Sequence, residues 1–349
     1  MSNIAEIDKN FKVTAEICKE GVEFYNIDNY PFKVYGIYRD GKKYRRLPKE
    51  VAASVSDGVY KLHADTAGGR VRFKTDSQRI YIISKMDRVG KMSHFPLTGS
   101  AGFDLYVKNE SYNYIKTFVP PFTIEDGFES VIDLKTKELR DITINFPLYS
   151  TVNELLIGID EGSLLTNGNE YANNKKLVYY GSSITQGGCA SRPGNTYQGF
   201  ISRRYDCDYI NLGFSGNAKA EQNMVDYICS LDMDVFIYDY DHNAPNYEHL
   251  KATHDKMYRQ IRAAHPEIPI IMMAAPCHSP SAAFIERSNL IKSNYENAVK
   301  NGDDNLYFID GPTLMKNTRN EGTVDNCHPN DLGFFSMAEA LTEVLDKIM

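Results

Sequence analysis

The chain has 349 residues, of which 42% are hydrophobic and 24% charged, and this globular composition excludes an intrinsically disordered protein. Its length exceeds what one ordinary hydrophobic core fills and indicates two domains. The net charge of −7 and the lack of a basic run with interleaved aromatic residues argue against a nucleic-acid partner.

Residues 1–10 are polar and lack the apolar stretch of a signal peptide. No later segment is apolar enough to span a bilayer, so we expect no membrane partner. The cysteines are scattered without a Cys-x-x-Cys pair, so neither a disulfide framework nor a zinc cluster is expected. They are Cys18, Cys189, Cys207, Cys229, Cys277 and Cys327. These features favour a cytoplasmic protein with free thiols, or a secreted one if a leader has been removed.

In the first half of the chain, apolar and polar residues alternate in short runs bounded by Gly, Asp, Asn or Pro. Such runs occur at 70–74, 79–83, 103–107 and 141–146. Alternation with a period of two predicts antiparallel strands packed as an all-β sandwich. Segment 162–176, rich in Gly, Asn and Lys, predicts a linker. The expected domains are therefore 1–172 and 173–349.

The second half alternates strands with helices. Nearly continuous apolar runs predict strands at 176–180, 209–212, 235–240, 268–274 and 306–309. Helices are expected between them, near 196–205, 219–231, 248–265 and 282–300. A last helix near 330–348 has one apolar stripe, formed by Phe334, Ala338, Leu341, Leu345 and Ile348. The pattern predicts an α/β domain with a parallel sheet covered on both faces, which binds ligands beyond the C-terminal strand ends.

Ser183 follows the first strand of the second domain and precedes a helix, so we expect its hydroxyl at the C-terminal edge of the sheet. A Ser hydroxyl needs a base to act as a nucleophile. Taken alone, Ser182 or Ser183 is equally compatible with a helix cap or a turn. Near the end of the chain, Asp325 and His328 are three residues apart on a tight loop. This spacing lets the carboxylate orient one ring nitrogen and leaves the other to accept the Ser183 proton.

Acyl transfer also needs hydrogen-bond donors for the oxyanion, and two further segments can supply them. Residues 211–217 follow the second strand, and Gly213 and Gly216 allow the backbone to approach a substrate closely. Residues 239–245 follow the third strand and contain Asn243, whose side-chain amide can donate. Each segment alone is equally compatible with an ordinary turn.

The order Ser183, Gly216, Asn243, His328 resembles the four sequence blocks of the SGNH, or GDSL-type, hydrolases. The resemblance runs from residue 176 to the end and implies a three-layer α/β/α fold. It implies that Ser183 is the nucleophile, His328 the base and Asp325 its orienting carboxylate. It also implies an oxyanion hole made of the Ser183 amide, the Gly216 amide and the Asn243 side chain. Two departures are Gly-Ser-Ser at 181–183 for Gly-Asp-Ser, and Asp-His-Asn-Ala at 241–244 for Gly-x-Asn-Asp.

The first domain also carries a recognisable motif. Residues 102–106, Gly-Phe-Asp-Leu-Tyr, resemble the G-x-D-L-Y signature of a β-sandwich, jelly-roll-like domain that precedes some GDSL-type hydrolases. Two-domain proteins of this kind resemble carbohydrate esterases that remove acetyl groups. The resemblance implies a serine esterase that acts on small acyl esters of a saccharide without a metal or other cofactor. We expect the first domain to form one wall of the site, with Asp104 and Tyr106 in structural roles. The oligomeric state is left open.

Several alternatives remain open at this point. An acyltransferase would use the same triad with an acceptor alcohol in place of water. A metal-dependent phosphoesterase would gather Asp239, Asp241, His242, Asp325 and His328 at one sheet edge. An inactive carbohydrate-binding protein is compatible with the sandwich domain, since 24 Tyr residues can partly replace the absent Trp. A nucleotide-binding module is the weakest alternative, because the glycine-rich stretch 181–188 lacks the Gly-Lys-Ser/Thr ending of a P-loop.

Overall fold

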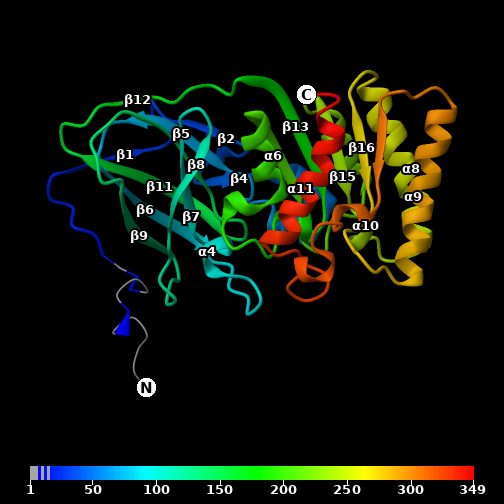
Figure 1. Cartoon of the computed structure of the whole chain (residues 1–349), viewed down its shortest axis with the longest axis horizontal. Coiled ribbons are helices and arrows are strands. Elements are labelled where there is room, and N and C mark those ends of the chain that lie inside the picture. Colours follow the sequence, from blue (N-terminus) through cyan, green and yellow to red (C-terminus); the bar gives the residue numbers. More distant parts are fainter. Residues whose placement is uncertain (1–6, 9–11, 14–15) are drawn as a thin grey trace.

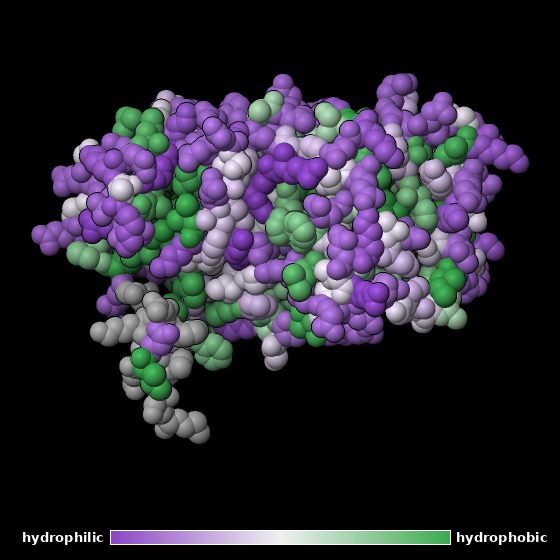
Figure 2. Space-filling view, viewed as in Figure 1, coloured by the Kyte–Doolittle hydropathy of each residue, from purple (hydrophilic) through white to green (hydrophobic). Residues whose placement is uncertain are grey.

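The computed structural model describes residues 7–8, 12–13 and 16–349. Figure 1 shows the two halves of the chain side by side, the β-rich half at the left and the α/β half at the right. Polar residues cover most of the face seen in Figure 2, and apolar residues form small separate groups on it. Among the described helices, none combines the length and the apolar character that crossing a bilayer requires.

The first half forms two antiparallel sheets that share one core, as the alternating pattern predicts. One sheet has the order β1-β11-β6-β9 and the other the order β12-β5-β10-β7-β8, with β2 also paired to β5. Phe73, Ile82 and Leu105 from the two sheets are buried together. The strands are β1 (Val22–Asn26), β2 (Lys33–Tyr35), β5 (Arg70–Thr75), β6 (Arg79–Arg88), β7 (Phe103–Lys108), β8 (Tyr112–Phe118), β9 (Gly127–Asp133), β10 (Arg140–Asn145), β11 (Thr151–Asp160) and β12 (Leu165–Asn167).

Short helices and a hairpin were not anticipated in this half. The hairpin joins β3 (Tyr38–Asp40) to β4 (Lys43–Arg45), and α4 (Leu97–Ser100) precedes β7. Helices α2 (Lys49–Val55) and α3 (Asp57–Leu62) pack away from the sandwich, because Ala52 and Val59 are buried in a core of the second half.

The segment expected to be a linker, 162–176, is largely built into the two sheets. Its first part contains β12, which pairs with β5, and its last residues belong to β13 (Asn173–Gly181). The prediction of an unstructured linker was therefore wrong. Polar side chains are tolerated in these strands because β12 is an edge strand and the early residues of β13 are partly exposed.

The second half is the predicted parallel sheet between two layers of helices. Its strand order is β14-β13-β15-β16-β17, and every neighbouring pair is parallel. The strands after β13 are β14 (Cys207–Gly213), β15 (Val235–Asp239), β16 (Ile270–Met273) and β17 (Leu306–Ile309). The long helices are α6 (Tyr197–Tyr205), α7 (Gln222–Cys229), α8 (Tyr247–Ala264), α9 (Ala282–Lys300) and α11 (Asp331–Leu345). The shorter ones are α5 (Ser183–Gln186), η2 (Pro193–Asn195), η3 (Asp241–Asn243), α10 (Gly311–Leu314) and η4 (Arg319–Gly322).

Each face of this sheet has its own core. Val178 and Tyr180 point to the core shared with α7, α8 and α9, whereas Leu177 and Tyr179 point to the core shared with α6 and α11. Alternate residues of one buried strand therefore serve opposite layers, which explains its continuous apolar sequence. The stripe expected on the last helix is buried from Phe334 to Leu345, as predicted.

The topology places a crevice beside the end of β13. The chain passes from β13 to β14 on one side and then to β15 on the other, so β13 lies where the strand order reverses. Gly181 at the end of β13 aligns with Gly213 in β14 and Asp239 in β15. Ligands of open α/β sheets bind at such switch points, beyond the C-terminal strand ends.

Candidate active site

The two serines in the turn after β13 have different roles. Ser182 caps the short helix α5, since its side chain accepts a hydrogen bond from the Ile184 amide at 3.2 Å. Ser183 is the first residue of that helix, and its Oγ lies 3.0 Å from Nε2 of His328. The capping role considered for either serine therefore falls to Ser182, and the Ser183 hydroxyl meets an imidazole.

His328 lies on the loop before α11, at the same edge of the sheet. Its Nδ1 is 2.8 Å from Oδ2 of Asp325, and its backbone amide donates to Oδ1 of the same carboxylate at 2.7 Å. The Cys327 amide donates to that Oδ1 as well, at 3.1 Å. Asn330 caps α11 by accepting from the Leu332 and Gly333 amides. The helix thus begins at Asp331, and Pro329 directly precedes the cap.

The Asp325 carboxyl is strongly biased toward its ionised form. Partial burial acts to raise its pKa, but hydrogen bonds from the ring and the amide of His328 outweigh it and lower the pKa to about 2. An ionised carboxylate on Nδ1 holds the proton there and leaves the lone pair of Nε2 facing Ser183. The arrangement can accept the hydroxyl proton and stabilise the resulting imidazolium.

The predicted oxyanion donors lie on the loops after β14 and β15. Gly216 has a φ of +68°, which favours glycine. Within the described part of the chain, neither the Ser183 nor the Gly216 amide donates to a protein acceptor. Asn243 donates one amide hydrogen to the Phe214 carbonyl at 2.9 Å, which ties the two loops together. Gly216 and Asn243 line the same open hollow at the surface.

The first domain contacts the segments that carry Ser183 and His328. Tyr149 donates from its hydroxyl to the Ser183 carbonyl at 3.1 Å, so the sandwich supports the turn that carries Ser183. His94, on the loop between β6 and α4, has its ring centroid 5.7 Å from that of His328. Buried Arg46 donates to the carbonyls of Asn211 and Gly213 at the end of β14. Sequence patterns of a sandwich carry no signal for these contacts, because they arise only when the two halves dock.

The G-x-D-L-Y segment holds the domains together. The fully buried Asp104 carboxylate accepts from the Gly194 amide at 2.9 Å and from Arg192 at 3.0 Å, and Asn145 donates to it at 2.7 Å. The Tyr106 hydroxyl accepts from the same Arg192 guanidinium. Both residues therefore have the structural role that was expected, and they fulfil it across the domain interface.

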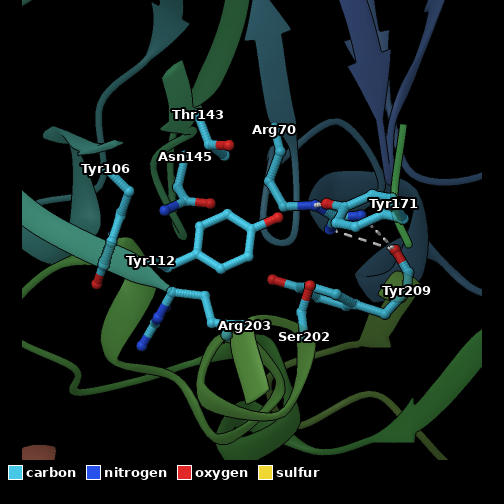
Figure 3. A pocket seen from close by; sticks show the side chains of 10 residues that line it. Arg70, Tyr106, Tyr112, Thr143, Asn145, Tyr171, Ser202, Arg203 and Tyr209 are labelled. Carbon is cyan, nitrogen blue, oxygen red and sulfur yellow. Dashed lines mark hydrogen bonds between the residues drawn. The ribbon is translucent and has the colours of Figure 1, made fainter. Parts of the chain in front are cut away.

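The same interface contains a small cavity, drawn in Figure 3. Arg70 lies between the rings of Tyr171 and Tyr209, donating to the Tyr171 hydroxyl at 2.9 Å. Tyr209 pairs with Leu177, well before the end of β13, so this cavity is set back from Ser183. Its polar and aromatic walls join α6 and β14 to β5, β7, β8 and β10.

The residues considered for a metal-dependent phosphoesterase do not form a shared ligand set in the described chain. Asp239 accepts a hydrogen bond from Thr185, and burial raises the pKa of its carboxyl to about 8. Asp241 accepts from the Ala275 amide at 2.9 Å. Burial lowers the pKa of the neighbouring His242, whose Nε2 has no partner among the described residues. Asp325 and His328 are engaged with each other.

Comparison with known proteins assigns a family model to each half of the chain. Residues 174–346 match the model of the GDSL-like lipase/acylhydrolase family. Residues 22–165 match a model described as the N-terminus of the SGNH-hydrolase type of esterase, the GxDLY domain. The chain therefore belongs to the GDSL-like lipase/acylhydrolase family. Within that family it is a carboxylic ester hydrolase with an N-terminal GxDLY domain.

Solved structures share the two-domain arrangement. A protein described as a GDSL-like lipase from Bacteroides ovatus is 27% identical with a TM-score of 0.85, over 94% of this chain and 98% of that one. A salicylyl-acyltransferase from a tetracycline biosynthetic pathway is 18% identical with a TM-score of 0.76, over the same shares of the two chains. A family two carbohydrate esterase from Cellvibrio japonicus is 11% identical with a TM-score of 0.61, again over 94% and 98%. No curated protein matches the chain.

Proposed function

We propose that the protein is a serine esterase that hydrolyses small acyl esters, above all acetyl esters, of a carbohydrate. The observation that carries the proposal is the hydrogen-bonded chain from Ser183 through His328 to Asp325. Its two links measure 3.0 Å and 2.8 Å, within the range of a hydroxyl bound to its base and a base bound to its orienting carboxylate.

The reaction takes place in two acyl transfers. Nε2 of His328 takes the proton as Ser183 Oγ forms a bond to the ester carbonyl carbon. The tetrahedral intermediate then expels the alcohol, which leaves with the proton from His328, and the acyl group stays on Ser183. Water attacks this acyl-enzyme with His328 again as the base, and the acid is released as Ser183 recovers its proton. Asp325 remains ionised and stabilises the imidazolium in both steps.

The developing oxyanion is stabilised by the amides of Ser183 and Gly216 and by Asn243. The two backbone amides have no other acceptor among the described residues, so they are available to a ligand. Asn243 uses one hydrogen on Phe214 and has a second to offer. Fixed donors of this kind act without reorganising during the reaction.

Two observations favour a small acyl group on a saccharide. Similar structures include an acetyl xylan esterase from Butyrivibrio proteoclasticus and a carbohydrate esterase from Clostridium thermocellum in complex with cellohexaose. The hollow beside Gly216 and Asn243 is open and lined by the Phe284 ring and by Arg287, which suits a sugar that stacks and hydrogen-bonds.

The decisive variant is Ser183→Ala, assayed on p-nitrophenyl acetate. We expect turnover to fall by at least about 10³-fold with the thermal midpoint retained. Ser182→Ala is the matched control: it removes a helix cap worth about 1 kcal/mol but keeps the nucleophile, so most turnover should remain. Unchanged turnover in Ser183→Ala would end the proposal.

A substrate screen tests the finer part of the proposal. Acetylated xylo- and cello-oligosaccharides are compared with long-chain lipid esters by acid release. Faster release from the saccharides supports the assignment, and faster release from the lipid esters contradicts it. Repeating the assay with an added alcohol acceptor separates the two fates of the acyl-enzyme: free acid indicates hydrolysis, and a new ester indicates an acyltransferase.

A further inference from the structure

Three side chains beside the site bring together potential metal-ligand atoms. The esterase reaction itself does not require this grouping. They are His94 from the first domain, Cys189 from the loop after α5, and His328. One ligand atom from each lies within 4.8 Å of the other two. Cys189 is 3% exposed, while His94 is exposed. In the described chain, neither the His94 ring nor the Cys189 thiol has a hydrogen-bond partner. The His94 ring does contact the ring of His328.

The state of His328 is suited to binding a cation. Because Asp325 is bound to Nδ1 at 2.8 Å, the lone pair is on Nε2, 3.0 Å from the Ser183 hydroxyl. A histidine that binds a metal usually donates its other ring N–H to a carboxylate. The carboxylate fixes the orientation of the ring and raises its basicity. The lone pair that serves as the base can therefore be taken by a metal ion.

We propose that His94, Cys189 and His328 form a Zn²⁺ site that switches the esterase off. One sulfur and two imidazole nitrogens are the donors that Zn²⁺ prefers, whereas Mg²⁺ and Ca²⁺ prefer oxygen ligands. Tetrahedral Zn²⁺ keeps such donors about 3.5 Å apart. The three donor atoms, all within 4.8 Å of one another, are close to this spacing, and the exposed side chain of His94 can adjust to it. Water completes the fourth position.

Binding requires a proton to leave. A zinc–sulfur bond forms as the S–H bond of Cys189 breaks, and the proton passes to solvent. The thiol is buried, and burial disfavours the charged thiolate, so the metal must overcome this cost, and we expect reversible binding. Occupation of Nε2 removes the acceptor of the Ser183 proton, which stops acylation. The binding itself does not depend on the proposed function; only the inhibition does.

The first test measures binding without activity. Co²⁺ is added to Ser183→Ala, and the thiolate-to-cobalt charge-transfer absorption is recorded in the near ultraviolet. We expect the band in this variant and its loss when Cys189→Ser is added, with competition by Zn²⁺. Cys327→Ser is the matched control and should keep the band. Absence of the band, or its persistence without Cys189, overturns the site even if the protein proves to be no esterase.

The second test measures inhibition of p-nitrophenyl acetate hydrolysis. We expect Zn²⁺ to inhibit the wild type, a chelator to restore activity, and Mg²⁺ to have no effect. With each variant compared with its own zinc-free rate, His94→Ala and Cys189→Ser should raise the inhibitory zinc concentration at least about tenfold. Equal inhibition of the wild type and both variants would place the metal elsewhere and overturn the proposal. A cobalt band without any inhibition would overturn the switch while leaving the binding site.

Discussion

Replacing Asn243 with alanine tests the proposed oxyanion donor whose surrounding sequence departs from the family pattern. The loop reads Asp-His-Asn-Ala at 241–244, and the structure nevertheless holds Asn243 against the loop that carries Gly216. One amide hydrogen is engaged by the Phe214 carbonyl at 2.9 Å, so a single hydrogen remains for the oxyanion. Loss of one such donor costs about 2.7–4 kcal/mol of transition-state stabilisation, or about 10²–10³ in turnover.

The variant also removes the bond to Phe214, which contributes about 0.5–1.5 kcal/mol to stability. The assay must therefore separate catalysis from folding. We measure kcat and KM on p-nitrophenyl acetate together with the thermal midpoint. We expect kcat to fall and KM to change little, because the donor stabilises charge that develops only after the substrate has bound.

Asn217→Ala, in the loop after β14 that carries Gly216, is the matched control. Its Nδ2 donates to the Ser215 carbonyl at 2.7 Å, so the variant loosens the loop without removing Asn243. We expect it to retain most of the turnover. The reasoning is refuted if Asn243→Ala keeps more than a tenth of the wild-type kcat, or if Asn217→Ala loses as much as Asn243→Ala.

Three further predictions rest on charges in the structure. Because the pKa of Asp325 is lowered to about 2, the stability that its carboxylate contributes is present above the ordinary carboxyl range and is lost as the pH falls toward 2. Asp325→Asn should therefore lower the thermal midpoint more at pH 6 than at pH 3, and an equal loss at both values would contradict this. The pKa of buried Asp239 is raised to about 8, so the folded state holds a proton that the unfolded state releases, and stability falls as pH rises from about 4 to 8. Asp239→Asn should therefore raise the thermal midpoint more at pH 8 than at pH 5; an equal shift would count against it. Asp104→Ala should lower the free energy of unfolding, measured in urea, by about 3 kcal/mol, because Arg192 loses a buried partner. A loss below about 1 kcal/mol would contradict the role of Asp104 in holding the two domains together.

The first domain makes hydrogen bonds to the segments that carry the candidate site residues. Tyr149 supports the carbonyl of Ser183, Arg46 holds the end of β14, and Asp104 fixes the loop at Gly194. These contacts involve buried polar groups, which are costly to leave unpaired and therefore set the docking of the two domains. The sandwich therefore supports the segments that carry the candidate site residues.

The amino-acid sequence by itself determined the alternation of elements and the order of the candidate site residues. Continuous apolar runs mark strands buried on both faces, and their parallel arrangement brings the ends of β13, β14 and β15 to one edge. Ser183, Gly216 and Asn243 each follow such an end within a few residues, so the local pattern predicts their place at this edge, whereas their roles were implied by the family resemblance. His328 was predictable because Asp325 lies three residues away and an amphipathic helix follows.

Only the tertiary structure decided which residues of the first half meet that edge. Tyr149 and His94 come to Ser183 and His328 from segments with no periodicity that points there. Helices α2 and α3 pack on the second half, and β12 extends a sheet where polar composition predicted a linker. The physical reason is that these contacts depend on the docking of two preformed surfaces. Local hydrophobic pattern encodes each surface but not the side chains that it will face.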